Sequence, residues 1–301
     1  MNSIKELRAD IGAVGTIESI TSVYQGIASL RMNQVRESVL KTKKFIEGVG
    51  FIYHHAKTAY LASLHKILSS KDKAKIEALS KVKRNGKVAY VYLSANEHLY
   101  GSLILDIYKS FIADVGEDRQ ADVVVIGKFG KALVGTTNLA NKIFYFEIND
   151  DKPKPEEITR VMELLIGYEK VVVHYGKMET LLTQVPERIE ITGGVEEVGA
   201  PGGAVKEYLF EPSPEAIIDF FESEIIGALF NQKVFEHQLS RFAARMVAMD
   251  QASQNADVIT DRLKKDFGRA KRRISNTKQL DVFAGMILWE DLPAGRHGKD
   301  D

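Results

Sequence analysis

The sequence of 301 residues contains no cysteine, which excludes disulfides, thiolate zinc sites and cysteine nucleophiles. It also lacks an apolar run of membrane-spanning length, since the densest runs, Val123–Ile126 and Val171–Val173, are only as long as strands. The first ten residues include acidic side chains and no apolar core, so we expect no secretory signal. We therefore expect a cytoplasmic protein with a sizeable core in one or two domains.

Proline is absent between Glu215 and Leu292, so a single helix of roughly 110 Å can run through nearly the whole interval. Within it, apolar or small residues recur at alternating spacings of three and four, and none of them is charged. The positions are Leu239, Phe242, Met246, Met249, Ser253, Ala256, Thr260, Leu263, Phe267, Ala270, Ile274 and Thr277. This pattern predicts a coiled-coil seam that needs one partner helix.

The beginning of the chain offers that partner. A second apolar stripe comprises Ile4, Leu7, Ile11 and Val14, followed by Ile17, Ile20, Tyr24 and Ile27. A three-residue slip separates Val14 from Ile17 and would locally overwind a supercoil. Because the two helices come from opposite ends of the chain, we expect them to pair antiparallel.

Lysine plus arginine equals aspartate plus glutamate, so the net charge is zero, yet the charges are sorted along the chain. Residues 211–224 hold five acidic residues and no basic one, whereas residues 262–278 hold eight lysines or arginines against Asp266. The basic run is consistent with a solvated helix face, and also with a band that meets an acidic partner. Nucleic acid is disfavoured, because the aromatic residues expected of a single-strand binder are missing.

The middle of the chain alternates between strand and helix patterns. The expected strands are Val88–Ser94, Ala121–Gly127, Lys142–Glu147 and Lys170–Tyr175, and the expected helices are Leu99–Val115 and Pro155–Gly167. Such alternation predicts an α/β domain with a mostly parallel sheet. We expect Gln184–Thr192 and Val205–Phe210 to form a β-hairpin, and Lys71–Gly86 to link helix and domain.

Motifs for bond chemistry are missing. The glycine-rich loop Gly193–Gly203 has no Gly-Lys-Ser/Thr ending and leads into no helix, and Gly127–Gly130 is more typical of a turn. The histidines are scattered and no nucleophile motif is present, so we expect no catalytic residue, no metal and no cofactor. Function is then expected to come from shape and contacts.

Five separated segments resemble the gamma subunit of F-type ATP synthases. The most specific is Ala243-Ala-Arg-Met-Val-Ala-Met249, which is similar to the C-terminal signature of that family. The others occur in the same order as in the family: Ile20-Thr21, Ser94-Ala-Asn-Glu-His-Leu-Tyr-Gly101, Val125-Ile-Gly-Lys-Phe-Gly130 and Tyr208-Leu-Phe-Glu-Pro212. Together they cover nearly the whole chain and identify a divergent member.

The resemblance implies a central rotor shaft without a catalytic site of its own. The shaft would turn inside a hexamer of alpha and beta subunits and couple ion translocation to ATP synthesis or hydrolysis. Its implied partners are those subunits, an epsilon-type subunit and the membrane rotor ring, on the cytoplasmic face of the bacterial plasma membrane. It would neither enter the membrane nor bind nucleic acid.

The implied architecture is a long antiparallel coiled coil of N- and C-terminal helices plus a central Rossmann-like α/β domain. We expect an N-terminal shaft helix in residues 1–70, the α/β domain in residues 71–212, a C-terminal shaft helix in residues 213–291 and a polar tail in residues 292–301. A non-rotary coiled-coil adaptor, and a nucleotide-binding enzyme built on the α/β domain, are the alternatives.

The resemblance also implies contact residues. Those expected to contact the catalytic ring are Thr21, Tyr24, Arg245, Met246, Met249, Arg262, Lys264, Lys265, Arg269, Lys271, Arg272, Arg273, Asn276, Lys278, Met286, Leu288 and Trp289. Those expected in the foot domain are Asn96, Gly101, Lys128, Gly130 and Glu236. The apolar tip Met286–Trp289 fits either an ordinary helix end or a contact with a hydrophobic collar of the ring.

Several positions depart from the family pattern. Lys271 and Arg272 replace an Arg-Gln pair, Asn276 a threonine, and Lys278 a glutamate. Tyr24 and Gly26 stand in place of two methionines, and Arg241 in place of a glutamate. These changes concentrate where family members contact the catalytic subunits, so the fold is expected to be conserved better than the contact set.

Overall fold

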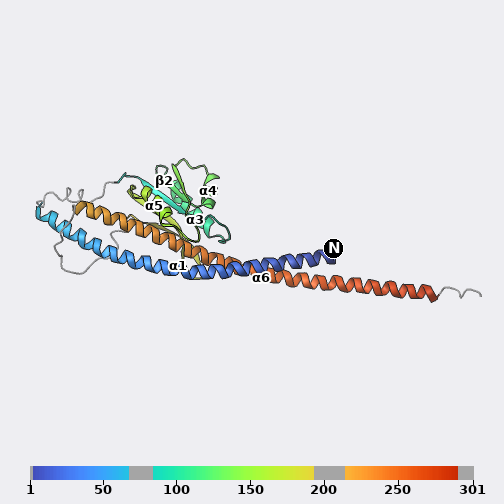
Figure 1. Cartoon of the computed structure of the whole chain (residues 1–301). Helices are drawn as coiled ribbons and strands as arrows, with labels where there is room; N and C mark the ends of the chain where they lie inside the picture. The colour runs from blue at the N-terminus through green and yellow to red at the C-terminus, as the bar shows by residue number, and fades with distance from the viewer. Residues whose placement is uncertain (1–2, 68–83, 193–213, 291–301) are drawn as a thin grey trace, which may run out of the picture. The chain divides into compact units, whose positions relative to one another are not determined.

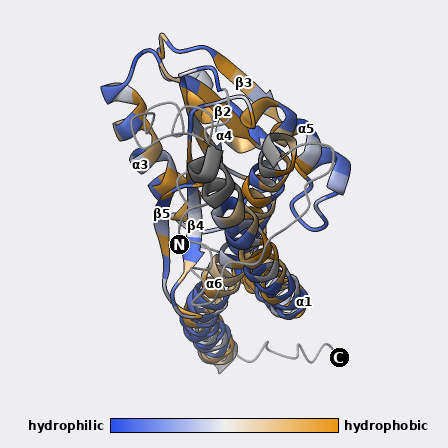
Figure 2. Cartoon of the chain, turned by 90° about the vertical axis from the view of Figure 1, so that its left-hand side faces the viewer, coloured by the Kyte–Doolittle hydropathy of each residue, from blue (hydrophilic) through white to orange (hydrophobic). Residues whose placement is uncertain are grey.

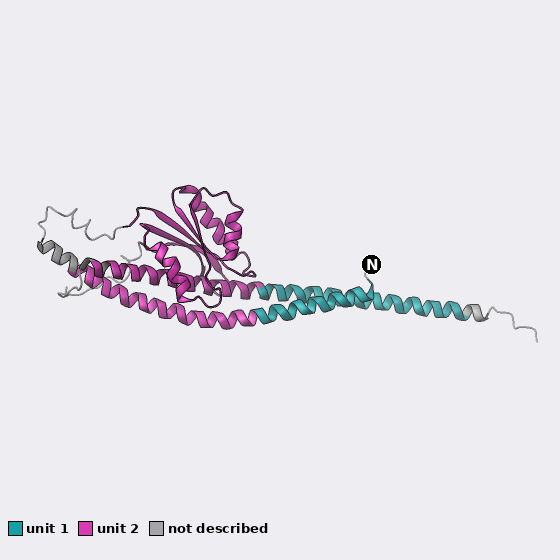
Figure 3. Ribbon diagram, turned by 45° about the horizontal axis from the view of Figure 1, so that its top comes forward, with its two compact units in different colours: residues 1–24, 249–301 teal, residues 25–248 magenta. Residues whose placement is uncertain are grey.

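The computed structural model of the chain describes residues 3–67, 84–192 and 214–290, which form two long helices and an α/β domain (Figure 1). The first helix, α1, spans Ile4–Ile67 and the last, α6, spans Pro214–Glu290. The chain divides into two compact units (Figure 3). Unit 1 is Met1–Tyr24 with Met249–Asp301, and unit 2 is Gln25–Ala248. In the described residues no helix is both long enough and apolar enough to cross a bilayer.

Unit 2 contains a five-stranded sheet in the order β3-β2-β1-β4-β5. Its strands are β1 Val88–Leu93, β2 Asp122–Ile126, β3 Ile143–Phe146, β4 Lys170–Met178 and β5 Gln184–Glu190. The first four run parallel, and β5 is antiparallel to β4. Parallel strands buried on both faces need continuous apolar runs, which is why the valine-rich β2 and β4 were recognisable in the sequence. The predicted mostly parallel α/β fold is confirmed.

The two faces of the sheet pack against different helices, and alternate residues of β1 divide between them. Tyr90 and Tyr92 lie in the cluster with α3, Leu103–Glu117, whereas Val91 lies in the cluster with α5, Pro155–Leu165, and with α6. Helix α6 contributes buried apolar residues to this second cluster, namely Ile225, Ile226, Ala228, Leu229, Phe230 and Val234. The apolar colouring of β2 in Figure 2 agrees with its complete burial. A long helix thus covers one face of the sheet.

Two details of the domain differ from the expectation. Helix α3 begins at Leu103 rather than Leu99, because Leu99 and Gly101 adopt positive φ angles of 75° and 58°, which end any helix that would include them. Helix α4, Lys128–Gly135, occupies a segment in which we expected only a turn. It is eight residues long and contains two glycines, so its sequence signal is weak.

Part of the predicted domain lies outside the described residues. Strand β5 corresponds to the first half of the predicted hairpin, but the second half, Val205–Phe210, falls in the undescribed range 193–213. The same holds for the glycine-rich loop, for most of the predicted linker and for the tail 292–301. Strand β5 pairs with β4.

Unit 1 contains two helical segments that lie side by side, from α1 and α6 (Figure 3). On α6 the predicted seam is buried at Met249, Ala256 and Thr260, and half-buried at Ser253, Leu263, Phe267 and Ala270. Beyond Ala270 the seam is absent, since every side chain from Lys271 to Met286 is exposed. Leu7, near the start of α1, lines one groove with residues 259–273 of α6, as the predicted antiparallel pairing requires.

The predicted slip in α1 is wrong. Leu7 and Thr21 are buried, and Ile11, Val14 and Glu18 are half-buried, so the three–four spacing continues without interruption. The apolar residues after Val14 point outward instead, with Ile17 51%, Ile20 50% and Tyr24 39% exposed. Pairing with α6 fixes which side of α1 faces the partner helix in unit 1. Glu18 and Thr21 lie on that side, and an apolar stripe remains exposed on the other side.

Candidate functional site

The first surface of functional interest is the basic face of α6 in unit 1. Its exposed residues are Arg262, Lys264, Lys265, Arg269, Lys271, Arg272 and Arg273, which we call the basic band. Asp266 lies within it and pairs with Arg269 at 3.4 Å. A groove of about 690 Å³ has Leu7, Ile259, Leu263 and Ala270 among its lining residues, together with Arg262, Arg269, Arg273 and Asp266. Apolar and cationic groups thus lie together, a combination suited to an amphipathic acidic partner.

The second surface is the part of α6 that follows the basic band. Asn276, Lys278 and Met286 are exposed, as predicted contact residues should be. Large apolar side chains are exposed beside them, at Leu280 67%, Val282 58% and Phe283 63%. Leu288 and Trp289 belong to α6, but their side chains lie outside the described residues. Exposed apolar side chains grouped in this way are typical of a surface that another protein covers.

The third surface is the apolar stripe of α1 in unit 1, formed by Ile17, Ile20, Val23 and Tyr24. Its exposed fractions range from 39% to 60%. Thr21, which we expected to contact the catalytic ring, belongs to the opposite side, because it is 6% exposed and donates a hydrogen bond to the Glu18 carbonyl at 2.9 Å. The paired helices therefore expose an apolar face on α1 and a cationic face on α6.

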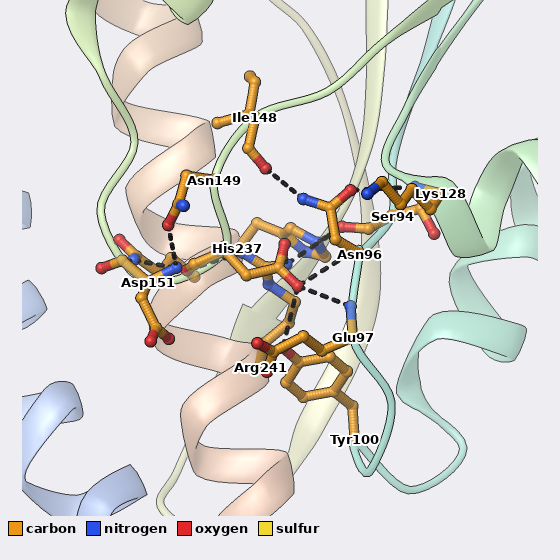
Figure 4. Close-up of polar contacts among 12 residues, drawn as sticks. Ser94, Asn96, Glu97, Tyr100, Lys128, Ile148, Asn149, Asp151, His237 and Arg241 are labelled. Carbon is orange, nitrogen blue, oxygen red and sulfur yellow. Dashed lines mark hydrogen bonds and ion pairs between the residues drawn. The ribbon is translucent and has the colours of Figure 1, made fainter.

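A fourth feature lies in unit 2, at the carboxyl edge of the sheet. The strand order reverses between β1 and β4, and open α/β sheets bind ligands in the crevice at such a point. Here the crevice is filled by His237 of α6 (Figure 4). Its Nδ1 accepts a hydrogen bond from the N–H of Gly176 in β4 at 3.0 Å, and its Nε2 lies 2.9 Å from the Ser94 carbonyl. Because Nδ1 is an acceptor, the ring is neutral and Nε2 is the donor.

Burial, followed by the positive charge of Arg241, lowers the pKa of His237 to about 3. The side chain is 3% exposed, so the neutral form is maintained throughout the physiological pH range. Gly176 is required beside it, since a Cβ there would lie 3.0 Å from Ser240 Oγ and 3.2 Å from the Leu103 methyl groups. The backbone of β4 thus approaches α6 closely.

One helical turn further, Arg241 forms a buried ion pair with Asp150. Arg241 Nη1 lies 2.5 Å from Asp150 Oδ1, and the two side chains are 6% and 7% exposed. The other oxygen of Asp150 accepts hydrogen bonds from the N–H groups of Asn96 and Glu97, each at 2.9 Å, and from the Tyr100 hydroxyl at 3.2 Å. Burial alone would raise the pKa of Asp150, but the Arg241 charge and these hydrogen bonds hold it below its ordinary value.

A further turn along, Arg245 binds the loop that follows β1. Its Nη2 lies 2.7 Å from Glu97 Oε2 and donates to the His98 carbonyl at 3.3 Å. The guanidinium also lies over the Tyr100 ring, 4.4 Å from its centroid, in a cation–π contact. Gln238 adds hydrogen bonds to the carbonyls of Asp150 and Asp151, at 2.8 and 2.9 Å. Polar side chains of α6 are thus bonded to the loops that follow β1 and β3 and to the Gly176 N–H of β4.

The space left at this edge is unsuited to a nucleotide. A cavity of about 330 Å³ is lined by Asn96, Lys128, Ile148, Asn149 and the carboxylates of Glu97, Glu147, Asp150, Asp151 and Glu157. Lys128 Nζ lies 3.7 Å from Glu147, which offsets its charge. Phosphate groups are repelled by such a lining. In the described residues no cluster of three or more histidines or acids has the arrangement of a metal site.

The predicted foot-domain residues are internal connectors in most cases. Asn96 donates to the Ile148 carbonyl at 2.7 Å and accepts from the Lys128 N–H at 3.1 Å, which ties two loops together. Gly101 has the positive φ of a turn, and a Cβ on Gly130 would lie 2.6 Å from that of Ser94. Glu236 accepts hydrogen bonds from Gln232 and Lys233 of its own helix. Lys128 alone of the five presents an exposed charged side chain.

Three predicted ring-contact residues are buried inside the chain, namely Thr21, Arg245 and Met249. Their side chains present little surface to a partner, and Met246 is half-buried. Conversely, sequence reasoning missed His237, Gln238 and Asp150. The sequence did contain a signal for the α6 residues of this contact, because His237, Arg241 and Arg245 recur every four residues on one face of that helix.

Comparison with known proteins agrees with this architecture. A family model described as ATP synthase matches residues 3–285. The ATP synthase gamma chain of Dichelobacter nodosus (strain VCS1703A) is 23% identical over 95% of this chain and 99% of its own length. That of Actinobacillus pleuropneumoniae serotype 3 (strain JL03) is 22% identical over the same shares.

A solved structure shares the fold. The central stalk of the Tetrahymena thermophila mitochondrial ATP synthase, determined with its c-ring, superposes with a TM-score of 0.53 at 16% identity. The match covers 78% of this chain and 99% of that one. With paired helices, an α/β domain whose crevice is filled by its own helix, and a family match over nearly the whole sequence, this chain belongs to the ATP synthase gamma chains, the non-catalytic central rotor shafts of F-type ATP synthases.

Proposed function

We propose that unit 1 is the part of the shaft that turns within the alpha and beta subunits, and that its exposed faces make the contacts. The observation that carries this proposal is the segment 271–286 of α6, in which every residue is exposed and several side chains are large and apolar. Such a segment needs a surrounding protein to cover it. The hydrophobic collar that we expect around Met286, Leu288 and Trp289 has the right chemistry.

The two faces of unit 1 differ in chemistry. The basic band offers attraction to acidic surfaces, while the α1 stripe of Ile17, Ile20, Val23 and Tyr24 offers apolar contact. A catalytic subunit that meets the basic face experiences a different environment from one that meets the apolar face. Rotation of an asymmetric shaft then biases each catalytic subunit in turn toward a different conformation.

Exposed ion pairs are individually weak, worth about 0 to 1 kcal/mol each. The contacts of Tyr24, Met246, Arg262, Lys264, Lys265, Arg269, Lys271, Arg272, Arg273, Asn276, Lys278 and Met286 are therefore proposed to act together. Distributed steric contact carries the force, and the basic band supplies attraction and orientation. No single charged residue is expected to be indispensable.

For unit 2 we propose contact with the membrane rotor ring and with an epsilon-type subunit, on the cytoplasmic face of the bacterial plasma membrane. The α/β domain is rigid at its carboxyl edge, where internal hydrogen bonds hold Asn96 and Asp150. Exposed apolar side chains lie elsewhere on it, at Leu181 44% and Leu182 75% in the β4–β5 turn. A rigid domain with such patches suits a foot that binds other subunits.

The proposal is tested by assembling the full chain with alpha and beta subunits. We expect one copy in each hexamer and ATP-driven rotation of the shaft. Reversing Arg262, Lys264, Lys265 and Arg269 to glutamate should slow rotation, with a smaller effect at high salt because screening weakens the attraction. Lys43→Glu with Lys44→Glu, at exposed positions of α1 in unit 2, is the matched control. Binding without any rotation would favour the adaptor alternative, and unchanged rotation in the reversed variant would reject the role of the band.

A further inference from the structure

We infer that three residues of α6 fix this helix to the α/β domain, so that the two rotate together when torque acts on the shaft. These residues are His237, Arg241 and Arg245, which we call the polar key. This inference rests on the proposed rotary function and concerns a junction within unit 2. The three key residues occupy one face of α6 over two helical turns, at spacings of four residues. They bind Ser94, Asp150 and Glu97 at the carboxyl edge of the sheet. Figure 4 shows His237 and Arg241 at this edge.

The need for a key follows from the rest of the junction. On the sheet face, α6 packs through an apolar cluster that includes Ile225, Phe230 and Val234. Hydrophobic contact is non-directional, so it resists separation of the domain from the helix better than it resists sliding or turning of one on the other. A rotor, however, must transmit force along a surface. Directional contacts are needed for that.

The key residues supply such directional contacts. His237 joins Ser94, which follows β1, to Gly176 in β4, with hydrogen bonds of 2.9 and 3.0 Å. Arg241 binds Asp150 in the loop after β3, and Arg245 binds Glu97 in the loop after β1. Hydrogen bonds weaken steeply with distance and misalignment, so a turn of α6 about its axis breaks the contacts to β4 and to the loops after β1 and β3 together. Buried charges that lose their partners in this way oppose the turn.

The position of the key is informative as well. The edge where β1 and β4 diverge is the ligand crevice of an open α/β sheet, and here the protein's own helix occupies it. A crevice between two strand ends is narrow and has backbone groups pointing into it. His237 inserted there is held on both sides, by the Ser94 carbonyl and the Gly176 N–H, which is the arrangement required to resist motion in either direction of rotation.

The experiment removes the buried ion pair between Arg241 and Asp150 while preserving the packing around it. In the double variant Asp150→Asn/Arg241→Met the buried ion pair is removed, while the asparagine side-chain oxygen can still accept hydrogen bonds from the N–H groups of Asn96 and Glu97. The complete synthase is reconstituted in vesicles, and ATP hydrolysis and ion pumping are measured together. We expect hydrolysis to continue while pumping against a preformed ion gradient is lost, because the domain slips on the shaft. Arg241→Lys, which keeps the charge without the fork, should restore part of the pumping.

The matched control is Lys170→Met/Glu190→Leu. This pair, at 2.8 Å, joins β4 to β5 within the sheet and does not touch α6. It should leave the number of ions pumped for each ATP unchanged. If the first double variant does not fold, Glu97→Gln/Arg245→Met provides the same test at a more exposed pair, since Glu97 is 57% exposed.

The outcomes separate this inference from the proposed function. Pumping and hydrolysis that remain coupled in a folded key variant would overturn the inference. A wild-type chain that assembles with the hexamer but supports no rotation would instead overturn the rotary function itself. Equal loss of coupling in the key variant and in the Lys170/Glu190 control would show a general structural effect, and would also count against the key.

Discussion

Arg241→Met is the most informative single substitution, because it keeps much of the side-chain volume and removes only the charged fork. Its partner Asp150 is 7% exposed and remains buried in the variant. Removal of one member of a buried ion pair typically costs about 3–5 kcal/mol. Asp150 retains hydrogen bonds from two backbone N–H groups and from Tyr100, so we expect about 3 kcal/mol, the lower end of the same range.

The assay is urea unfolding of the full chain, followed by circular dichroism. Lys109→Met is the control, since Lys109 pairs with Asp106 at 2.9 Å on the surface of α3, where the side chains are 75% and 36% exposed. Such a pair contributes less than about 1 kcal/mol. Equal unfolding midpoints for the two variants would refute the reasoning that burial makes the Arg241 pair indispensable.

The same variant carries a signature in its pH dependence. In the wild type the pKa of Asp150 is depressed, so its stabilisation is complete above the ordinary value and is lost as the pH falls through the folded value. Without Arg241, burial becomes the main influence and raises this pKa. Protonation then relieves the unpaired charge, so the stability difference from wild type should shrink between neutral pH and about pH 4. A difference that stays constant over this range would contradict the assignment.

Three further predictions concern histidines, a glycine and the helix register. Burial lowers the pKa of His237 to about 3 and that of His174 to about 4, so the unfolded chain binds more protons than the folded chain. The unfolding free energy should therefore fall as the pH drops from about 6.5 toward 4, and His237→Gln should flatten this slope in a denaturant titration. Gly130→Ala places a Cβ 2.6 Å from that of Ser94 and should cost about 1–3 kcal/mol in thermal unfolding, whereas Gly135→Ala, with open space around it, should cost nothing. Leu7→Ala should destabilise the chain by about 2 kcal/mol and Ile17→Ala by less than about 0.5 kcal/mol, and the reverse order of melting temperatures would disprove the register of α1.

The long helices and the sheet were predictable because their signals are local. A seam of uncharged residues at spacings of three and four identified the α6 coiled coil, and valine-rich runs identified β2 and β4. The register of α1 was not predictable in the same way. Its most apolar positions after Val14 face outward, while Glu18 and Thr21 face the partner helix. Hydrophobicity identifies an apolar stripe in the sequence, but the pairing with α6 determines which side of α1 is buried.

The predicted contact residues show the same difference between what the sequence predicts and what it does not. Positions such as Lys271, Asn276 and Lys278 are exposed and so accessible to a partner. Arg245 carried the same sequence signal, yet it is buried on Tyr100 and Glu97. Residue type alone does not separate an arginine that faces a partner from one that holds its own fold.

By itself the sequence determined that this protein is a pair of long helices around an α/β domain, because periodicity and composition act over a few residues at a time. Only the tertiary structure decided that α6 enters the crevice of the sheet. His237, Arg241 and Arg245 find their partners at Ser94, Glu97 and Asp150, which are between 91 and 148 positions away along the chain. Pairings over such separations follow from how the sheet and helices pack together, and a local sequence pattern does not predict them.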